Sequence, residues 1–512
     1  MAVGVGAWHG RSAPAQPNQL SDGNPADPRL DAAERAASLE SCDVAVVGGT
    51  PSGVAAALAA ARAGAKVTLI EPRPLLGGDI TYAWINQFDV PIKGVHSAHS
   101  PVDYGIFSEF YRKLGLAFPP EDARELIDQK IKAEPNIRVL TRTSVAKLGL
   151  MDGKLSNALL HVEGKNWVRL SAPAWVDATN DGDIAARAGA GFYLGREGTN
   201  PDRAMQAAGL FFKLRNVNWD RLWDYVTSTK TISADHAIAQ KPGAKISTDM
   251  KFRGDKVILR LGGGHGPYAW ERGDIAKGYV PHGPNIDVLS INFGRTGKDE
   301  VVLNCLNILG VNGLTRYSRT QALNEARAEL PFLVAYLRGK MPGLEQAELA
   351  GAAPELYIRE TRHISGLYKL TGDDVQDARV FPDRIALCAY SMDLHPYKRN
   401  ERIKSGTRRW VFQLPLRTLI PRRVDGVFVA SRSLSATYSA AGAARVIPIT
   451  MAAGQAAGLS AAMCARDKVS PHDFADDPAR VGALQEQLKK DGVDIGDNAP
   501  ALAKAAAPKP SG

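Results

Sequence analysis

Residues 43–71 show the clearest pattern of hydrophobic and polar positions in the chain. A short β-branched run, Asp43 to Gly49 (DVAVVGG), precedes an Ala-rich stretch, Val54 to Gly64 (VAAALAAARAG), and a second apolar run, Lys66 to Glu71 (KVTLIE). Short continuous apolar runs predict buried strands, and the longer Ala-rich stretch predicts a helix that ends at the glycine. The order strand, glycine-rich turn, helix, strand is a βαβ unit with two parallel strands.

The stretch that follows this unit predicts two helices and then a group of strands. Amphipathic helices are expected near 105–114 and 122–133. Three strand-like runs follow at 137–150, 155–162 and 167–179, and the connections between them carry the Asp, Asn and Gly residues that favour turns. We expect a β-meander whose last strand can return to the first sheet.

Beyond residue 204 strands alternate with one long helix. Strands are expected at 209–214, 255–261 and 299–308, and a long helix runs from near Ser318 to Met341. After Gly426 the sequence returns to a buried strand at 427–431 and an Ala/Gly-rich helix at 449–465. We therefore interpret the middle of the chain as an inserted α+β domain.

These elements predict an α/β protein with a discontinuous first domain. The first 40 residues lack the basic and apolar regions of a signal peptide and are rich in Pro, Gly and polar residues, which is typical of a disordered leader. The last residues resemble a frayed tail. The expected divisions are 1–40 leader, 41–204 and 391–466 first domain, 205–390 inserted domain, 467–494 C-terminal helical segment and 495–512 tail.

Composition narrows the range of partners. Hydrophobic residues make up 45% and charged residues 23% of the 512 positions, which is ordinary for a soluble globular protein. The formal charge of +9 comes from Lys and Arg spread among Asp and Glu without a basic block, so we expect no nucleic acid partner. No apolar run approaches the ~20 residues of a membrane helix. The four cysteines form no C-x-x-C pair and fit a reducing compartment, so we expect a cytoplasmic protein.

The loop VVGGTPSG, at residues 46–53, departs by one residue from the pattern G-x-G-x-x-G. Gly48 and Gly49 follow a strand directly, and Gly53 lies where the helix must pack closely on the sheet. Glu71 ends the next strand about 20 residues on, where a carboxylate can accept hydrogen bonds from ribose hydroxyls and would repel a 2′-phosphate. This context favours a dinucleotide site over an accidental glycine-rich turn, and it leaves NAD and FAD both open.

Thr50 occupies the place of the middle glycine. Threonine is a favoured helix N-cap, and Pro51 suits the first helical position, where its missing N–H costs nothing. The helix then starts one residue earlier, and its free N–H groups still point at a phosphate. We predict that the Thr50 hydroxyl caps the helix or contacts a pyrophosphate.

The sequence after the second strand, RPLLGGDIT at 73–81, adds a cation and a second pair of glycines. Arg73 can reach the phosphate side, and Gly77 and Gly78 permit another close backbone approach. At this point the chain resembles the FAD-dependent oxidoreductases of the glutathione-reductase-like superfamily, in particular the broad FAD-dependent oxidoreductase family related to succinate dehydrogenase and fumarate reductase flavoproteins. Members typically read VVGGGPAG, then an acidic residue and LGG, where this chain has VVGGTPSG, Glu71 and LLGG.

Three later segments strengthen the resemblance, which spans roughly residues 42 to 465. The segment 177–190 looks like the family's Ala-Thr-Gly and Asp-Gly-Asp elements, with Asn180 where glycine is usual. The segment 356–375 is similar to its Arg-Glu-x-Arg stretch. The segment 427–458 looks like the second flavin-contacting element, with Ser431 where glycine is common. The combination of these segments is specific for the family but gives almost no information about the substrate.

The resemblance implies FAD as the cofactor and a Rossmann-like FAD-binding domain with a β-meander, joined to an inserted α+β substrate or cap domain. Whether FAD is attached covalently is left open by the sequence. The residues expected to contact FAD are Gly48, Gly49, Thr50, Pro51, Ser52, Gly53, Glu71, Arg73, Gly78, Asp79, Val145, Ala178, Asp183, Arg432, Gly442 and Arg445.

Arg445 is a candidate for the chemistry as well. Small residues from Ala440 to Ala444 let backbone approach a flat ring, and a helix that begins near Pro448 directs the positive end of its dipole at whatever precedes it. Arg445 beside that helix can stabilise the negative charge of a reduced flavin. The alternative is an ion-pair partner in a closely packed run.

His395 and Arg362 are the other catalytic candidates. His395 lies within six positions of Tyr390 and Asp393, and its ordinary pKa suits a general acid or base. Arg362 belongs to the Arg-Glu-x-Arg stretch, in which Arg359, Glu360, Arg362 and His363 can place a cation near an anionic substrate. The alternatives are a loop histidine without a catalytic role and an exposed cluster of ion pairs.

Two further patterns do not predict sites. His96 and His99 are three residues apart with no third ligand nearby, so we expect no metal. The stretch RLGGGHGPY at 260–268 follows a strand, but Pro267 and a polar loop come next instead of a helix. We interpret it as a wide turn and expect no second nucleotide site.

The sequence therefore predicts an FAD-dependent dehydrogenase or reductase that transfers a hydride between a small organic substrate and flavin N5, with an unidentified electron donor or acceptor. A flavin-dependent monooxygenase is the nearest alternative, although Ala430-Ser431-Arg432 replaces the Gly-Asp element typical of aromatic hydroxylases. A non-catalytic FAD-binding or electron-transfer protein is the third reading, favoured by the departures at Thr50, Asn180 and Ser431. The substrate, the direction of the reaction and the oligomeric state are left open.

Overall fold

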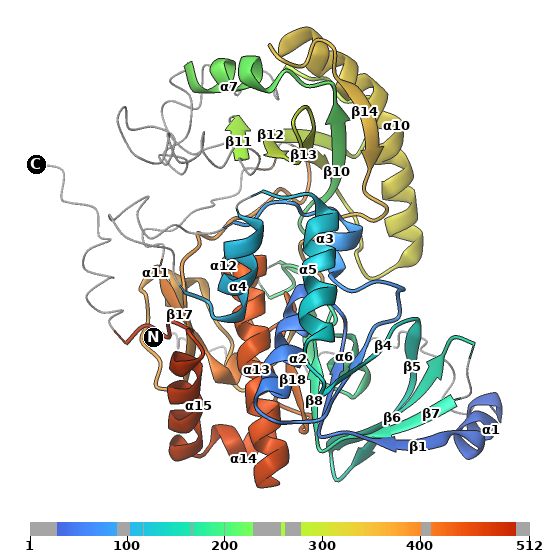
Figure 1. Ribbon diagram of the computed structural model, residues 1–512, viewed down its shortest axis with the longest axis vertical. Helices are drawn as coiled ribbons and strands as arrows, with labels where there is room; N and C mark the ends of the chain where they lie inside the picture. The colour runs from blue at the N-terminus through green and yellow to red at the C-terminus, as the bar shows by residue number, and fades with distance from the viewer. Residues whose placement is uncertain are drawn as a thin grey trace, which may run out of the picture.

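The protein is built around two large β-sheets, shown in Figure 1 by a computed structural model. The structure describes residues 28–89, 103–115, 117–164, 167–198, 200–228, 258–261, 278–399, 401 and 411–497. The histidines at 96 and 99 and the loop that follows residue 261 lie outside this part of the chain.

The first sheet is parallel and forms the centre of the lower body in Figure 1. Its strand order is β18-β8-β2-β3-β4, and all four pairings are parallel. Every residue of β2, β3, β8 and β18 is buried, because helices or other strands cover both faces. The strand bounds are β2 Val44–Val47, β3 Val67–Ile70, β4 Ile137–Leu140, β8 Ala174–Asp177 and β18 Val427–Val429.

Helices α2 (Pro51–Arg62) and α13 (Ile447–Asp467) pack on each other against this sheet. Their close approach depends on two glycines of α13. A Cβ at Gly454 would lie 2.1 Å from the Ser52 carbonyl oxygen, and one at Gly458 would lie 2.0 Å from the Ala56 carbonyl oxygen. By length and composition α13 alone among the described helices could cross a membrane, but 94% of its apolar window is buried inside the protein.

The expected meander is a second layer beside the parallel sheet. The strands β5 (Thr143–Met151), β6 (Lys154–Val162) and β7 (Trp167–Ser171) pair antiparallel. The predicted strand runs 137–150 and 167–179 each split, because a turn sends their halves to different sheets: β4 and β8 join the parallel sheet, while β5 and β7 stay in the meander.

Part of the predicted disordered leader is folded, while residues 1–27 lie outside the described residues. Residues Pro28–Ala36 form helix α1, and Ser38–Ser41 form strand β1, which extends the meander as a parallel partner of β7. Glu34 of α1 lies 2.7 Å from Lys147 Nζ and 2.6 Å from Arg169, so ion pairs add to the backbone pairing. The prediction of disorder up to residue 40 is therefore wrong for 28–40.

The inserted domain forms the upper body in Figure 1 around the sheet β11-β12-β13-β10-β14. All its pairings are antiparallel, and the long helix α10 (Arg316–Lys340) and the helix α7 (Trp219–Ser228) accompany it. The sequence pattern missed β12 and β14. The strands are β10 Ala208–Arg215, β11 Ile258–Leu261, β12 Ile286–Arg295, β13 Val301–Ile308 and β14 Glu348–Ala352.

The inserted domain also ends earlier than expected. Its hydrophobic core reaches Ile358, whereas Leu370 and later residues belong to the core of the lower body. Strand β15 (Arg362–Ile364) already pairs with β9 (Phe192–Leu194) of the first domain. The chain thus returns near residue 360 rather than 390, and residues 356–364 bridge the two bodies.

Shorter elements complete the lower body. Helices α14 and α15 form the C-terminal helical segment at the end opposite the inserted domain (Figure 1). The predicted tail begins too early, because Ile495 is only 2% exposed. The remaining elements are α3 Gly78–Tyr82, α4 Ile106–Leu114, α5 Pro120–Lys132, α6 Asp183–Arg187, α11 Gly372–Gln376, β16 Arg384–Cys388, β17 Phe412–Pro415, η2 Leu416–Thr418, α12 Tyr438–Ala444, α14 Pro471–Ala475 and α15 Pro478–Lys490.

Candidate functional site

Thr50 is the N-cap of α2, as the sequence predicts. Its backbone is extended, and its Oγ1 accepts the Gly53 N–H at 3.2 Å while donating to the Ala178 carbonyl oxygen at 2.8 Å. Pro51 begins the helix. The hydroxyl therefore ties the loop both to its own helix and to the end of β8.

The glycines of the loop leave no room for side chains. A Cβ at Gly48, whose φ is +106°, would lie 2.6 Å from the Ala178 carbonyl carbon. A Cβ at Gly53 would lie 1.8 Å from the Gly48 carbonyl oxygen, and one at Gly49 would lie 2.5 Å from a methyl group of Leu76. The backbone is thus packed tightly between β8 and the loop after β3, as a phosphate-binding turn requires.

Glu71 lies at the end of β3, next to this loop. Its side chain is 1% exposed and accepts the Gly49 N–H at 2.7 Å and the Arg73 Nε at 2.7 Å. Arg73 also reaches Glu355 of the inserted domain at 3.2 Å. The Glu71 carboxylate therefore holds the backbone of the glycine loop and links it to Arg73. Glu71 occupies the position where a carboxylate is expected to bind the ribose.

Arg432 joins two acidic residues on the other side of the loop. Its guanidinium lies 2.7 Å from Asp181 and 3.4 Å from Asp79, and burial opposes its charge while Asp181 and Asp79 raise its pKa. Asn180 donates to Asp79 at 3.0 Å. The asparagine that replaces the family's usual glycine thus holds Asp79 in place. Burial raises the pKa of Asp79 even against Arg432 and Arg73.

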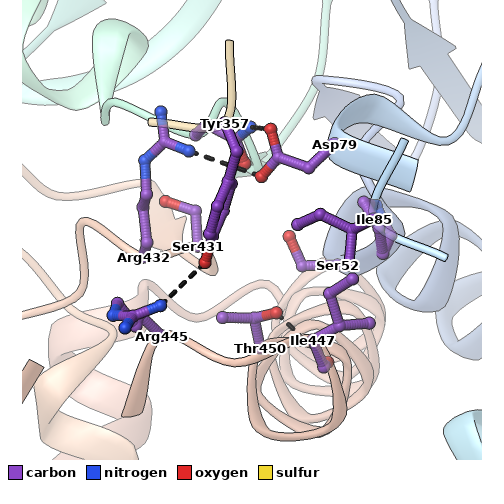
Figure 2. Close-up of a pocket in the computed structure, with 11 residues that line it drawn as sticks. Ser52, Asp79, Ile85, Tyr357, Ser431, Arg432, Arg445, Ile447 and Thr450 are labelled. Atoms are coloured by element: carbon purple, nitrogen blue, oxygen red, sulfur yellow. Dashed lines mark hydrogen bonds and ion pairs between the residues drawn. The ribbon is translucent and has the colours of Figure 1, made fainter. Parts of the chain in front are cut away.

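A small cavity, partly open to solvent, lies where these elements meet (Figure 2). The N-termini of α2 and α13 both contribute to it, and α13 has no side-chain cap on its Val446 end. Two helix dipoles therefore favour negative charge there. The cavity is lined by Pro51, Ser52, Asp79, Ile85, Asn180, Tyr357, Ser431, Arg432, Arg445, Ile447 and Thr450.

The glycine loop, the carboxylate at the end of β3 and the two helix N-termini suit the diphosphate and ribose of FAD. Arg432, which lines this cavity, has a buried Nε atom without a hydrogen-bond partner among the described residues. Such an unsatisfied donor at a cavity wall fits a polar ligand. These residues would hold the cofactor.

Arg445 is the centre of a polar cluster at the cavity wall. Its Nη1 donates to the Tyr357 hydroxyl at 2.7 Å, as Figure 2 shows, and its Nη2 reaches Asp393 Oδ2 at 2.8 Å. Asp393 also lies 3.3 Å from His395 Nε2. Burial opposes the charge of Arg445, but Tyr357 and Asp393 outweigh it and raise its pKa.

His395 is neutral at physiological pH. Burial and the nearby charge of Arg359 lower its pKa to about 4, although Asp393 opposes them. Its backbone N–H donates to Gln206 Oε1 at 3.0 Å, which holds the segment against the start of β10. The structure therefore brings two of the three predicted catalytic residues, Arg445 and His395, into one cluster through Asp393.

Arg362, the third candidate, is bound elsewhere. It lies 2.7 Å from Asp183 and 2.9 Å from the Asp181 carbonyl oxygen, so it fixes the turn before α6. Arg359, three residues earlier, lies instead near Arg445 and His395. It is 3% exposed, donates to the Ala207 carbonyl oxygen at 2.5 Å and lies 5.2 Å from the Tyr357 ring centroid.

Other predicted cofactor residues have contacts within the protein. The Val145 carbonyl of β5 accepts Arg187 Nη1 at 2.7 Å. Gly78, with φ +47°, passes close to Thr50, since a Cβ there would lie 3.0 Å from the Thr50 Cα. A Cβ at Gly442 would lie 3.1 Å from the Asp393 carbonyl oxygen, so this glycine admits the segment that carries Asp393.

Tyr357 and Gln206 were not predicted. Each belongs to the cluster only because β10 and residues 356–359 run side by side, with Gly209 and Tyr357 exchanging two backbone hydrogen bonds at 2.9 and 2.8 Å. A lone tyrosine or glutamine gives no local signal of this. Among the described residues no group of His, Cys, Asp and Glu side chains could hold a metal, and all four cysteines are buried and free.

The parallel sheet, the glycine loop and the cavity between two helix N-termini define a Rossmann-type flavoprotein. Residues 43–488 match the model of the FAD dependent oxidoreductase family. The chain belongs to this family, and its cofactor is FAD.

Three solved structures to which this chain is similar are the following. A geranylgeranyl bacteriochlorophyll reductase-like protein from Thermoplasma acidophilum is 14% identical, with 92% of this chain and 89% of that chain covered and a TM-score of 0.40. The myxobacterial chondrochloren halogenase CndH is 12% identical over 92% and 87%, with a TM-score of 0.42. The p-nitrophenol 4-monooxygenase PnpA from Pseudomonas putida DLL-E4 is 10% identical over 91% and 94%, with a TM-score of 0.39. Comparison with curated proteins gives no match.

Proposed function

We propose that this FAD-dependent oxidoreductase is a dehydrogenase or reductase that moves a hydride between a small organic substrate and its flavin. The observation that carries the proposal is the cluster of buried Arg445 with part-buried Asp393 and His395 beside the cavity that Arg445 lines. A neutral imidazole next to a fixed guanidinium provides a proton acceptor and a cation in one place.

Bound FAD supplies the two-electron chemistry, taking up or releasing a hydride at flavin N5. His395 takes the proton that leaves an oxidised substrate, and it returns that proton when the reaction runs as a reduction. Asp393 holds the ring nitrogen of His395 at 3.3 Å and so favours its protonated form during transfer. Arg445 stabilises negative charge that develops beside it. An external electron donor or acceptor completes the cycle.

The first experiment is the absorption spectrum of the purified protein before and after denaturation. A yellow protein that releases FAD establishes non-covalent binding, and colour that stays with the precipitated chain establishes covalent attachment. The holoenzyme is then mixed anaerobically with a panel of small metabolites. Bleaching of the flavin by a substrate, without oxygen, supports a dehydrogenase.

A matched pair of variants tests the role of His395. His395→Gln is expected to slow flavin bleaching by roughly 10²- to 10⁴-fold, the usual contribution of a general acid or base. His472→Gln is the control, because His472 bonds to the Pro421 carbonyl at 2.8 Å and lies in α14. Equal rates in the two variants would contradict the proposed role of His395.

The same assays separate the alternatives. A monooxygenase would consume oxygen and place an oxygen atom in the product, with little anaerobic bleaching by substrate alone. A protein that binds FAD without catalysis would be photoreduced to a stable flavin and show no substrate-dependent bleaching. Either result would replace the dehydrogenase proposal.

A further inference from the structure

We propose that Arg359 and Arg445 together bind a carboxylate group of the substrate. This inference rests on the proposed function, because it assigns the chemical class of the molecule that exchanges the hydride. Three observations support it: buried positive charge exceeds nearby negative charge, buried hydrogen-bond donors lack partners, and both guanidiniums contact the side chain of Tyr357.

The first observation is that two buried cations share one close carboxylate. Arg445 forms an ion pair with Asp393 at 2.8 Å, whereas no ion pair of the described residues includes Arg359. Arg359 is nevertheless 3% exposed, and burial together with the charge of Arg445 lowers its pKa to about 10. A buried guanidinium usually has an anionic partner, so an anion is expected beside Arg359.

Neighbouring carboxylates do not supply that anion. Glu360 follows Arg359 in the chain, but its two oxygens accept the Gln206 N–H at 3.0 Å and contact His363 Nε2 at 2.9 Å. Asp393 raises the pKa of Arg359 through its charge, but its hydrogen bonds go to Arg445 and His395. Asp89 acts on Arg445 through its charge.

The second observation is a set of buried donors without partners. Gln206 is 2% exposed, and its Nε2 has no hydrogen-bond partner among the described residues. It adjoins Ala207, whose carbonyl oxygen accepts Arg359, and its Oε1 accepts the His395 N–H. The Nε of Arg445 is likewise unsatisfied. Buried donors left unpaired are costly, so oxygen atoms of a ligand are their natural partners.

The third observation is that both guanidiniums contact Tyr357, whose ring lines the cavity. Arg359 Cζ lies 5.2 Å from the ring centroid, and Arg445 donates to the hydroxyl (Figure 2). A Cβ at Gly209 would lie 3.4 Å from both terminal nitrogens of Arg359, so the bare glycine lets β10 pass close to the charge. The two cations thus meet at one aromatic side chain, with Arg359 over its ring and Arg445 at its hydroxyl, and Tyr357 and Arg445 line the cavity.

A carboxylate fits this site better than a phosphate. Two cations and the carboxylate of Asp393 leave about one positive charge, which a single carboxylate neutralises and a phosphate dianion exceeds. The planar fork of guanidinium matches the two oxygens of a carboxylate. A bound carboxylate would also offset the two arginine charges that lower the pKa of His395, and so prepare this histidine to accept a proton.

The test uses the FAD-loaded protein and two probes of equal shape, benzoate and benzamide. Each is titrated while the flavin absorption spectrum and the heat of binding are recorded. We expect benzoate to bind at least tenfold more tightly than benzamide. Arg359→Gln is expected to weaken benzoate binding at least tenfold, and Arg359→Lys to restore part of it. Arg422→Gln is the control, because Arg422 also donates to a backbone carbonyl, that of Leu367, and lies on the exposed surface.

Several results would overturn the proposal. These are equal binding of benzoate and benzamide, unchanged benzoate affinity in Arg359→Gln at full FAD content, and tighter binding of inorganic phosphate than of benzoate. If Arg359→Gln does not fold, Gln206→Glu serves as the second variant. The glutamate side chain keeps the shape of glutamine but adds a negative charge, so it must abolish benzoate binding. Failure of the hydride-transfer proposal is recognised separately, because the holoenzyme would then bind benzoate without being bleached by any carboxylate substrate.

Discussion

Replacement of Thr50 by valine removes a hydroxyl and keeps the shape of the side chain. The hydroxyl accepts the Gly53 N–H at 3.2 Å and donates to the Ala178 carbonyl oxygen at 2.8 Å, and Thr50 is 3% exposed. Loss of an N-cap costs ~1 kcal/mol. A buried carbonyl left without its donor adds ~1–3 kcal/mol. Together these give roughly 3 kcal/mol of lost stability.

Binding of FAD should suffer as well, because the same hydroxyl orders the loop. If about 1.4 kcal/mol of the lost stability must be recovered by ordering this loop when FAD binds, the affinity for FAD falls roughly tenfold. The measurements are urea unfolding of the FAD-free protein and a fluorescence titration of FAD. Two controls are available: Thr50→Ser keeps the hydroxyl, and Thr315→Val removes the equivalent cap of α10, which accepts Ser318 N–H at 3.4 Å in the inserted domain.

Wild type, Thr50→Ser and Thr315→Val should bind FAD with similar affinity. Thr50→Val should bind FAD much more weakly than these three proteins. Thr315→Val should lose only cap stability of ~1 kcal/mol. Unchanged FAD affinity in Thr50→Val, or an equal loss in Thr315→Val, would refute the argument that the Thr50 hydroxyl orders the phosphate loop.

Three further predictions concern packing, charge and pH. Gly53→Ala places a Cβ 1.8 Å from a carbonyl oxygen and should abolish FAD binding or folding, whereas Gly482→Ala, with nothing within 4 Å, should leave the melting temperature unchanged or higher. Asp181→Asn removes a 2.7 Å ion pair from buried Arg432 and should cost roughly 3 kcal/mol in urea unfolding, and a loss below 0.5 kcal/mol would contradict it. Folding lowers the pKa of His395 from 6.5 to about 4. As the pH falls, His395 is therefore protonated in the unfolded chain before it is protonated in the folded protein. Stability should therefore fall as pH drops from about 6.5 to about 4, by no more than about 3 kcal/mol at this site, and His395→Gln should flatten that part of the curve.

The nucleotide-binding half of the site could be predicted from the sequence because its parts are close along the chain. Strand β2, the loop, α2 and β3 lie within residues 44–70, and the residue types at Thr50 and Pro51 are those of a helix start. Capping and strand burial are local properties, so pattern and residue type were enough. The length of helix α10 followed for the same reason.

Elements whose partners lie far along the chain were less well predicted. The strand run 137–150 is continuous in hydrophobicity, yet β4 and β5 enter different sheets because a turn between them changes the partner strand. Strand β1 has little apolar character of its own and exists because β7 offers it an edge. The prediction of a disordered leader failed there because edge pairing leaves little trace in composition.

The sequence by itself determined the family, the FAD-binding loop and the presence of catalytic residue types at 359–363 and 390–395. Only the tertiary structure decided which of them meet. Arg359 lies beside Arg445 and Tyr357, while Arg362 turns to Asp183, because Tyr357 pairs with Gly209 of β10 and β15 pairs with β9. Which side of an extended segment faces a cavity depends on the register of these pairings, and no pattern within the segment itself records it.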